Sequence, residues 1–186
     1  MSDPDSVGLL AYDGVDGRAL VSVHDFLVRA SRRGCAVAPT VYSLVPSDRV
    51  SSSTGLGIEP DDVLIGTPGV VVVPGGRTAD GDPTYPTELP ERVGQLSEAG
   101  ATLVGIGSGA LALGEAGLLA DRRATTAAPF RDALGSHAVS VVDGPVVESG
   151  GVITATGADD APEVVGRLLD AVCSEEERSR VGAGEN

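Results

Sequence analysis

The stretch from Ala101 to Thr126, ATLVGIGSGALALGEAGLLADRRATT, decides the fold of this chain. It begins with a short apolar and β-branched run, Ala101 to Ile106, of the kind that forms a buried parallel strand. The run ends in a cluster formed by Gly105, Gly107 and Gly109, and we expect a helix directly after it. A strand-to-helix turn this sharp points its central residue over the end of the sheet. The sequence therefore predicts a candidate site at this turn.

Strand-like and helix-like segments alternate along the rest of the chain, which is typical of a doubly wound α/β domain. We predict a mostly parallel sheet sandwiched by helices, in a flavodoxin-like arrangement. The expected strands are 7–11, 36–43, 70–73, 102–106, 124–126 and 152–155, and the expected helices are 20–34, 89–99, the segment after Gly109, and one that buries Val164, Val165, Leu168, Leu169 and Val172. A small hairpin is expected over 50–58, a second one pairs 139–142 with 146–148 through Asp143-Gly144, and the irregular loop 77–90 covers the site.

Length and charge set the outer bounds. A chain of 186 residues fits a single domain over residues 1–186, with an ordered core of about 6–173 and a charged tail over 174–186. The net charge is −14, and all 13 lysine or arginine positions are arginine. Two interpretations remain open: a cytoplasmic protein of an extreme halophile, or the acidic proteome of a GC-rich genome. Both disfavour nucleic acid, and we expect no direct nucleic-acid partner, because phosphate binding requires a positive surface.

Several other classes of protein are disfavoured. Cys35 and Cys173 form no metal-binding spacing, and we interpret them as two buried small hydrophobes. No apolar run has membrane-spanning length and the first residues are acidic, so we predict a cytoplasmic protein without a signal peptide or membrane contact. Gly105 to Ala110 satisfies a dinucleotide-binding pattern, but it lies late in the chain and no strand-end carboxylate follows at the required spacing. We therefore predict neither a cofactor nor a metal.

The opening stretch resembles the ThiJ/PfpI family, within the class I glutamine-amidotransferase-like fold, and is most similar to its isocyanide hydratase branch. In that family the strand ends in a Val-Cys-Thr-Gly type turn, and the helix runs on into a Gly-Leu-Leu...Arg-Arg-Ala-Thr-Thr-His-Trp segment. Here the turn is Ile106-Gly107-Ser108-Gly109, and residues 117–128 are GLLADRRATTAA. The resemblance extends to VVVVPGG at 70–76 and GGVITATG at 150–157. It implies that the family's cysteine falls on Gly107 and its histidine on Ala127.

The resemblance also implies an acidic partner for the cysteine, on the first helix. In a hydratase-like register this position falls on Ala19, and in a protease-like register it falls near Arg18. Asp13 and Asp16 are the only carboxylates nearby. Neither register restores the acid, so three positions that carry the family's chemistry are altered together.

By the same resemblance, the ligand pocket is formed by Gly75, Gly76, Arg77, Gly107, Ser108 and Asp16. In the family, backbone amides beside the turn hold a developing oxyanion, and here those amides fall near Gly76 and Ser108. We therefore expect a small polar or anionic ligand. Arg77 follows the Pro-Gly-Gly turn and is interpreted either as a ligand-binding residue or as a solvated loop arginine. The family also implies a homodimer.

These observations predict a protein that has lost covalent catalysis and keeps a small-molecule-binding or regulatory role. The alternative is a hydratase, hydrolase or glyoxalase-like enzyme that uses Ser108, an activated water or the Asp13/Asp16 loop. His24 and His137 are interpreted as structural or solvated. Domains of this kind also occur as sensory parts of AraC-type regulators, but no helix-turn-helix extension is evident, so regulation would act through a partner.

Overall fold

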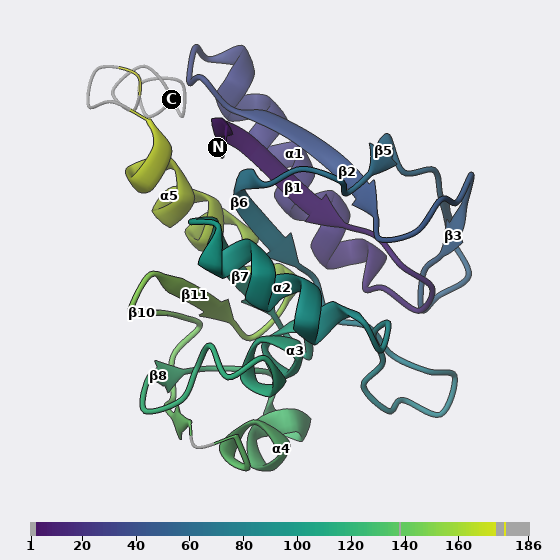
Figure 1. Cartoon of the computed structure of the whole chain (residues 1–186), viewed down its shortest axis with the longest axis vertical. Helices are drawn as coiled ribbons and strands as arrows, with labels where there is room; N and C mark the ends of the chain where they lie inside the picture. Colours follow the sequence, from purple (N-terminus) through teal and green to yellow (C-terminus); the bar gives the residue numbers. More distant parts are fainter. Residues whose placement is uncertain (1–2, 138, 174–176, 178–186) are drawn as a thin grey trace.

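A seven-stranded sheet forms the centre of the computed structural model, which describes residues 3–137, 139–173 and 177. The strands are β1 (Asp3–Leu10), β2 (Ala38–Ser43), β5 (Asp62–Val63), β6 (Pro68–Val73), β7 (Thr102–Ile106), β10 (Val146–Ser149) and β11 (Val152–Ala155). They lie in the order β10-β11-β7-β6-β1-β2-β5 (Figure 1). Every neighbouring pair is parallel except β10 with β11. The predicted mostly parallel sheet is confirmed.

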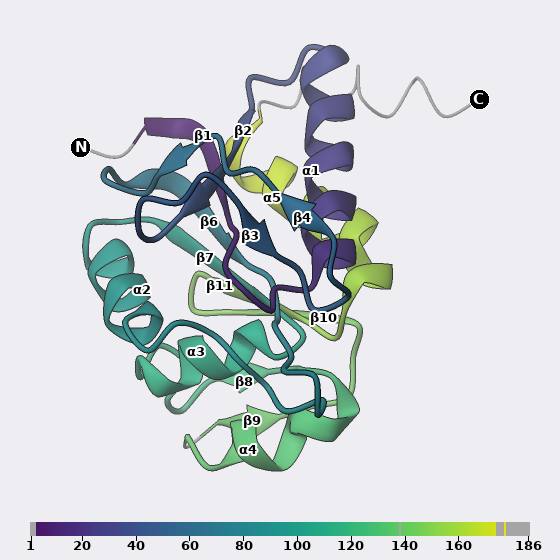
Figure 2. The same ribbon diagram turned by 90° about the vertical axis from the view of Figure 1, so that its right-hand side faces the viewer.

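Helices cover both faces of this sheet (Figure 2). Helices α1 (Gly17–Arg32) and α5 (Ala161–Val172) pack on one face, and α2 (Leu89–Glu98) and α3 (Gly109–Glu115) pack on the other. The strand β6 contributes valine side chains to both faces of the sheet. Val70 and Val72 point into the core beneath α1 and α5, whereas Val71 and Val73 point into the core beneath α2 and α3. A strand buried on both faces needs this continuous run rather than an alternating one.

Local signals set the ends of the first helix. The side chain of Asp16 caps α1 by accepting the backbone N–H groups of Arg18 and Ala19, at 3.0 and 3.1 Å. Gly34 follows the helix with a φ of +96°, a left-handed conformation that glycine adopts without strain. The predicted helix between them is therefore confirmed, with its buried stripe facing the sheet.

The carboxyl-terminal third differs from the prediction in one pairing. The expected hairpin between 139–142 and 146–148 is wrong: β9 (Ser140–Val141) pairs in parallel with β8 (Arg123–Ala124), and β10 pairs with β11. Gly150 and Gly151 both have positive φ, at +59° and +79°, and form the two-residue turn between β10 and β11. Two left-handed residues match the twist of antiparallel strands, so this glycine pair outcompetes Asp143-Gly144. The hairpin of β3 (Val50–Ser51) and β4 (Gly57–Ile58) is confirmed.

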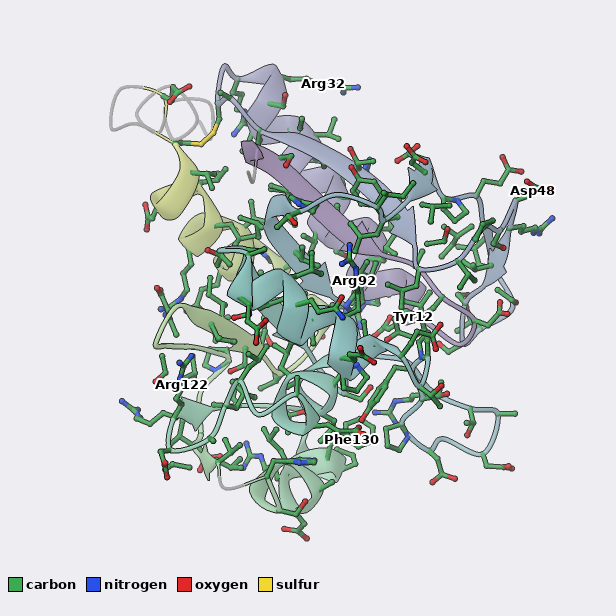
Figure 3. The ribbon with its side chains drawn as sticks, viewed as in Figure 1. Tyr12, Arg32, Asp48, Arg92, Arg122 and Phe130 are labelled. Carbon is green, nitrogen blue, oxygen red and sulfur yellow. A yellow bond between two sulfur atoms is a disulfide. The ribbon has the colours of Figure 1, made fainter. Side chains whose placement is uncertain are left out.

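The two cysteines correct a second expectation. Both are buried, as predicted, but they form a disulfide bond rather than packing as free thiols. Cys35 precedes β2 and Cys173 ends α5, and Figure 3 shows the bond at the end of that helix. The two cysteines meet because the parallel topology brings the start of β2 and the end of α5 to the same end of the sheet. Their separation of 138 positions gave no local signal of this pairing. Disulfides are favoured in oxidising surroundings, which the predicted cytoplasmic location does not supply.

In the described part of the chain, no helix is both long and apolar enough to cross a membrane. The charged tail expected over 174–186 lies outside the described residues, apart from Glu177, whose carboxylate accepts the backbone N–H of Ala36.

Reduction of the disulfide should destabilise the fold. The bond joins residues 138 positions apart, and opening a loop of this length restores much conformational freedom to the unfolded chain. We expect the free energy of unfolding to fall by about 2–4 kcal/mol, measured by denaturant titration with and without a dithiol reductant. The double variant Cys35→Ser/Cys173→Ser is the control, because its stability should not respond to reductant. Equal midpoints for the unaltered chain under both conditions would contradict the prediction.

Candidate functional site

Four parallel strands end side by side, and the segments that follow them enclose one cavity of about 200 Å³. This edge of a doubly wound sheet is where such folds bind ligands. Its lining residues are Asp16 and Arg18 after β1, Gly75, Gly76 and Arg77 after β6, Gly107 and Ser108 after β7, Thr156, Gly157, Ala158 and Asp159 after β11, and Ala127 and Phe130. The structure thus brings together all six residues that the sequence predicted for the pocket.

Gly107 forms the apex of the turn between β7 and α3. Its φ of +58° lies in the left-handed region, which glycine adopts at little cost. A Cβ added at this position would have only the carbonyl oxygen of Thr156 within 4 Å, at 3.5 Å. The space in front of the apex is therefore open to a side chain, although this sequence supplies none.

The backbone of the apex is held from two sides. The N–H of Gly107 donates to the carbonyl of Ala155 at 2.8 Å, and the hydroxyl of Thr126 donates to the carbonyl of Gly107 at 2.7 Å. Thr126 is fully buried. Sequence reasoning noticed this threonine only as part of the RATT segment and missed its role. The turn keeps its shape through these bonds, without a contribution from an apex side chain.

The turns after β6 and β7 touch backbone to backbone. A Cβ added to Gly109 would lie 2.1 Å from the carbonyl oxygen of Val73, and one added to Gly75 would lie 2.9 Å from the nitrogen of Ser108. Both distances are too short for any side chain, so glycine is required at 75 and 109. This close contact brings the Pro-Gly-Gly turn against the apex.

Ser108 links the same two turns through its side chain. Its hydroxyl accepts the N–H of Gly76 and donates to the carbonyl of Gly76, both at 3.0 Å. The serine is only 3% exposed. The Gly76 amide, which the resemblance assigns to oxyanion binding, therefore already has an acceptor. No histidine or carboxylate among residues 3–137, 139–173 and 177 bonds to the Ser108 hydroxyl.

Tyr12 supports the Pro-Gly-Gly turn from beneath. Its hydroxyl donates to the carbonyl of Pro74 at 2.6 Å, and the ring is buried. Burial raises the pKa of this hydroxyl far above its ordinary value, and the nearby Asp16 carboxylate raises it further. Tyr12 therefore stays protonated and remains a hydrogen-bond donor at every physiological pH.

Charged side chains surround the mouth of the cavity. Arg18 forms an ion pair with Asp159, and Asp16 is occupied as the cap of α1. The guanidinium of Arg77 lies over the ring of Phe130, with its carbon 4.7 Å from the ring centroid. Phe130 is buried and was not predicted from the sequence, although it is one of only two phenylalanines in the chain. Figure 3 labels it below α3.

Comparison with known proteins identifies the family of this chain. The sequence model of the DJ-1/PfpI family matches residues 5–171. The chain belongs to this family. Among curated proteins, comparison by sequence finds no significant match.

Solved structures of DJ-1-like proteins share the fold. Schizosaccharomyces pombe DJ-1 is similar with a TM-score of 0.80 at 19% identity, covering 97% of this chain and 98% of that one. Drosophila melanogaster DJ-1beta gives 0.81 at 23%, covering 99% and 97%. An AraC family transcriptional regulator from Pseudomonas putida gives 0.82 at 22%, covering 97% and 98%. At these identities the likeness concerns the fold alone.

The positions predicted for the chemistry of the DJ-1/PfpI family can now be located. Gly107 and Ala127 face the same cavity. Of the two registers considered for the acid, only Arg18 lines the cavity, whereas Ala19 is 0% exposed within the core beneath α1 and α5. The cavity wall at this point therefore carries the Arg18 guanidinium, with the carboxylates of Asp16 and Asp159 also in the lining.

The remaining candidates lie away from the cavity. Asp13 accepts the N–H of Ser51 at 2.8 Å, so its loop presents only Asp16 to the pocket. The ring of His137 packs against Gly114 of α3, and His24 lies on α1 outside the lining. Within the described ranges, no three His, Cys, Asp or Glu side chains are grouped to hold a metal ion.

Substitution of the buried serine should weaken the fold. Ser108→Ala leaves the N–H of Gly76 without its hydroxyl acceptor, while the C=O of Gly76 keeps the N–H of Thr84, and we expect a loss of about 1–3 kcal/mol in the free energy of unfolding. Ser136→Ala is a matched control, because that exposed hydroxyl also donates to a backbone carbonyl but water can replace it. If the two variants were equally stable, the bridging role assigned to Ser108 would be wrong. Denaturant titration supplies both values.

Proposed function

We propose that this DJ-1/PfpI family member has given up the family's covalent catalysis and binds a small molecule in the cavity at the end of β7. One observation carries the proposal: the cavity is formed in front of an apex, Gly107, that has room for a side chain and lacks one. A pocket without its nucleophile can still recognise a ligand, whereas it cannot form a covalent bond to it through that position.

The surroundings of the apex support the same conclusion. Ala127 has no group that exchanges a proton, and Arg18 cannot serve as a general acid at physiological pH because a guanidinium does not give up its proton. The Gly76 amide is already bonded to Ser108. The chemistry expected of the site in the family would thus lack its nucleophile, its histidine, its acid and one donor for an oxyanion.

An enzyme built on Ser108 finds less support. The Ser108 hydroxyl donates to a carbonyl, and a nucleophile needs instead a base that accepts its proton. Thr156 also places a hydroxyl in the lining, and this hydroxyl donates to the Asp160 carboxylate at 2.5 Å. The same carboxylate accepts the N–H of Gly157, so the pair belongs to the cap of the short helical turn at Ala158–Asp160.

Finer features of the proposal come from the resemblance and the composition. The segment 117–126 favours the isocyanide hydratase branch as the origin of the chain. We propose a homodimer from a halophile whose ligand binding serves regulation through a partner. The cytoplasmic location expected from the sequence is not part of the proposal, because the Cys35–Cys173 disulfide favours oxidising surroundings. Light scattering at several salt concentrations measures the assembly state directly.

Turnover assays on an apex series test the proposal. We expect the native chain to leave methylglyoxal, cyclohexyl isocyanide, peptides and small amides unchanged. Gly107→Cys/Ala127→His places a thiol and an imidazole in the lining of the same cavity, and we expect measurable turnover of at least one substrate. Gly107→Ala is the matched control, since it fills the apex with a methyl group and should stay inactive.

The opposite result is equally clear. Turnover by the native chain that disappears in Ser108→Ala, with the variant still folded by circular dichroism, would replace the proposal by a serine enzyme. Native turnover that survives Ser108→Ala would point to an activated water and would also overturn it.

A further inference from the structure

We infer that the ligand of this cavity is a small carboxylate that binds edge-on to the guanidinium of Arg77. The inference rests on the proposed function and names the chemical class of ligand for the same site. It is carried by the pairing of charges around the cavity, the seat of Arg77 and the size of the space.

The four charged side chains that line the cavity differ in their partners. Arg18 and Asp159 pair with each other, and the Asp16 carboxylate accepts two backbone N–H groups of α1. Arg77 is the fourth, and no carboxylate in the described ranges pairs with its guanidinium. Asp16 keeps its negative charge, but its bonds direct it to the first turn of α1, so Arg77 is the lining cation without a carboxylate partner and the group placed to receive an anion.

The environment of Arg77 also orients it. The carbon of its guanidinium lies 4.7 Å from the centroid of the Phe130 ring, so the ring covers one face of the group, and the side chain is exposed. Its backbone N–H is bonded to the carbonyl of Gly14 at 2.8 Å, so the base of the side chain is anchored as well. A guanidinium held in this way presents parallel N–H donors that match the two oxygens of a carboxylate.

The size of the cavity limits the rest of the ligand. Its volume of about 200 Å³ equals that of roughly seven water molecules. Sites for drug-sized ligands begin at roughly 300 Å³, so nucleotides and peptides are too large. Beyond the charged mouth the wall includes Gly107 and Ala127, which suit a short carbon skeleton. A carboxylic acid of a few carbons matches both the charged mouth and the small residues of the inner wall.

The overall charge of the chain makes this arginine more significant. With a net charge of −14, the molecule repels anions over most of its surface. A carboxylate is therefore held only where a cation is fixed locally and not neutralised by a neighbour. Arg77, although exposed, meets both conditions through its contact with Phe130, whereas Arg18 fails the second because Asp159 pairs with it.

Calorimetric titration of the full chain with propanoate and pyruvate, beside the neutral propanamide, tests the inference. All titrations use one potassium chloride concentration at which every variant is folded by circular dichroism. We expect the carboxylates to bind with a dissociation constant on the order of 1 mM or tighter, and propanamide at least tenfold more weakly. Arg77→Leu should weaken carboxylate binding roughly ten- to a hundredfold.

Two further variants separate local recognition from general charge. Arg32→Leu removes the same charge at the far end of α1, well away from Phe130 in Figure 3, and should leave binding unchanged. Arg77→Lys keeps the charge but loses the planar donor pair, so it should recover only part of the affinity. A loss in Arg32→Leu equal to that in Arg77→Leu would overturn the inference.

The remaining outcomes are distinguishable from a failure of the proposed function. Equal affinity for propanamide and propanoate, or no saturable heat with any carboxylate, overturns the carboxylate inference and leaves non-catalytic binding of another ligand class standing. Chemical conversion of pyruvate, detected by NMR on the recovered sample, instead overturns the proposed loss of catalysis. Affinity that is unchanged in Arg77→Leu removes Arg77 from the site.

Discussion

The site depends on a contact between two pieces of main chain. The turn after β7 approaches the end of β6 so closely that a methyl group on Gly109 would lie 2.1 Å from the Val73 carbonyl. This approach is possible only because both turns carry glycine where they meet, at 75 and 109. It places the Gly107 apex against the Pro-Gly-Gly turn, and the cavity is the space that the two turns and their neighbours enclose. The position of the pocket therefore follows from a backbone contact, which the side chains of Ser108, Tyr12 and Thr126 then reinforce.

This architecture explains why the proposed loss of catalysis would leave the fold intact. Gly107 is held by Ala155 and Thr126, and the Pro-Gly-Gly turn is held by Tyr12 and Ser108. None of these bonds involves a reactive group. A family built on such a frame can exchange the residue at the apex without loss of the surrounding shape, because strain at the apex is lowest when that residue is glycine.

The sequence was a good guide wherever periodicity and glycine spacing reported directly on the backbone. The β7 strand and the α1 stripe were predictable from the local pattern of apolar residues. The six residues that the family resemblance suggested for the pocket line one cavity, as the strand ends of a parallel sheet meet at one edge. Pairings between segments far apart in the sequence were not predictable. The β8–β9 ladder, the Cys35–Cys173 bond and the contact of Arg77 with Phe130 join segments whose separation carries no local signal. The Gly150-Gly151 turn did carry one, since two adjacent glycines are a strong hairpin signal.

The disulfide gives the molecule a property that none of its non-covalent contacts can provide. Cys35 and Cys173 turn the segment between them into a covalent ring that contains β6, β7, β11 and every cavity wall except those that follow β1. A protease that cuts the exposed loop after Arg77 opens this ring once but releases no fragment. The nicked chain remains one molecule with its two halves still facing each other across the pocket.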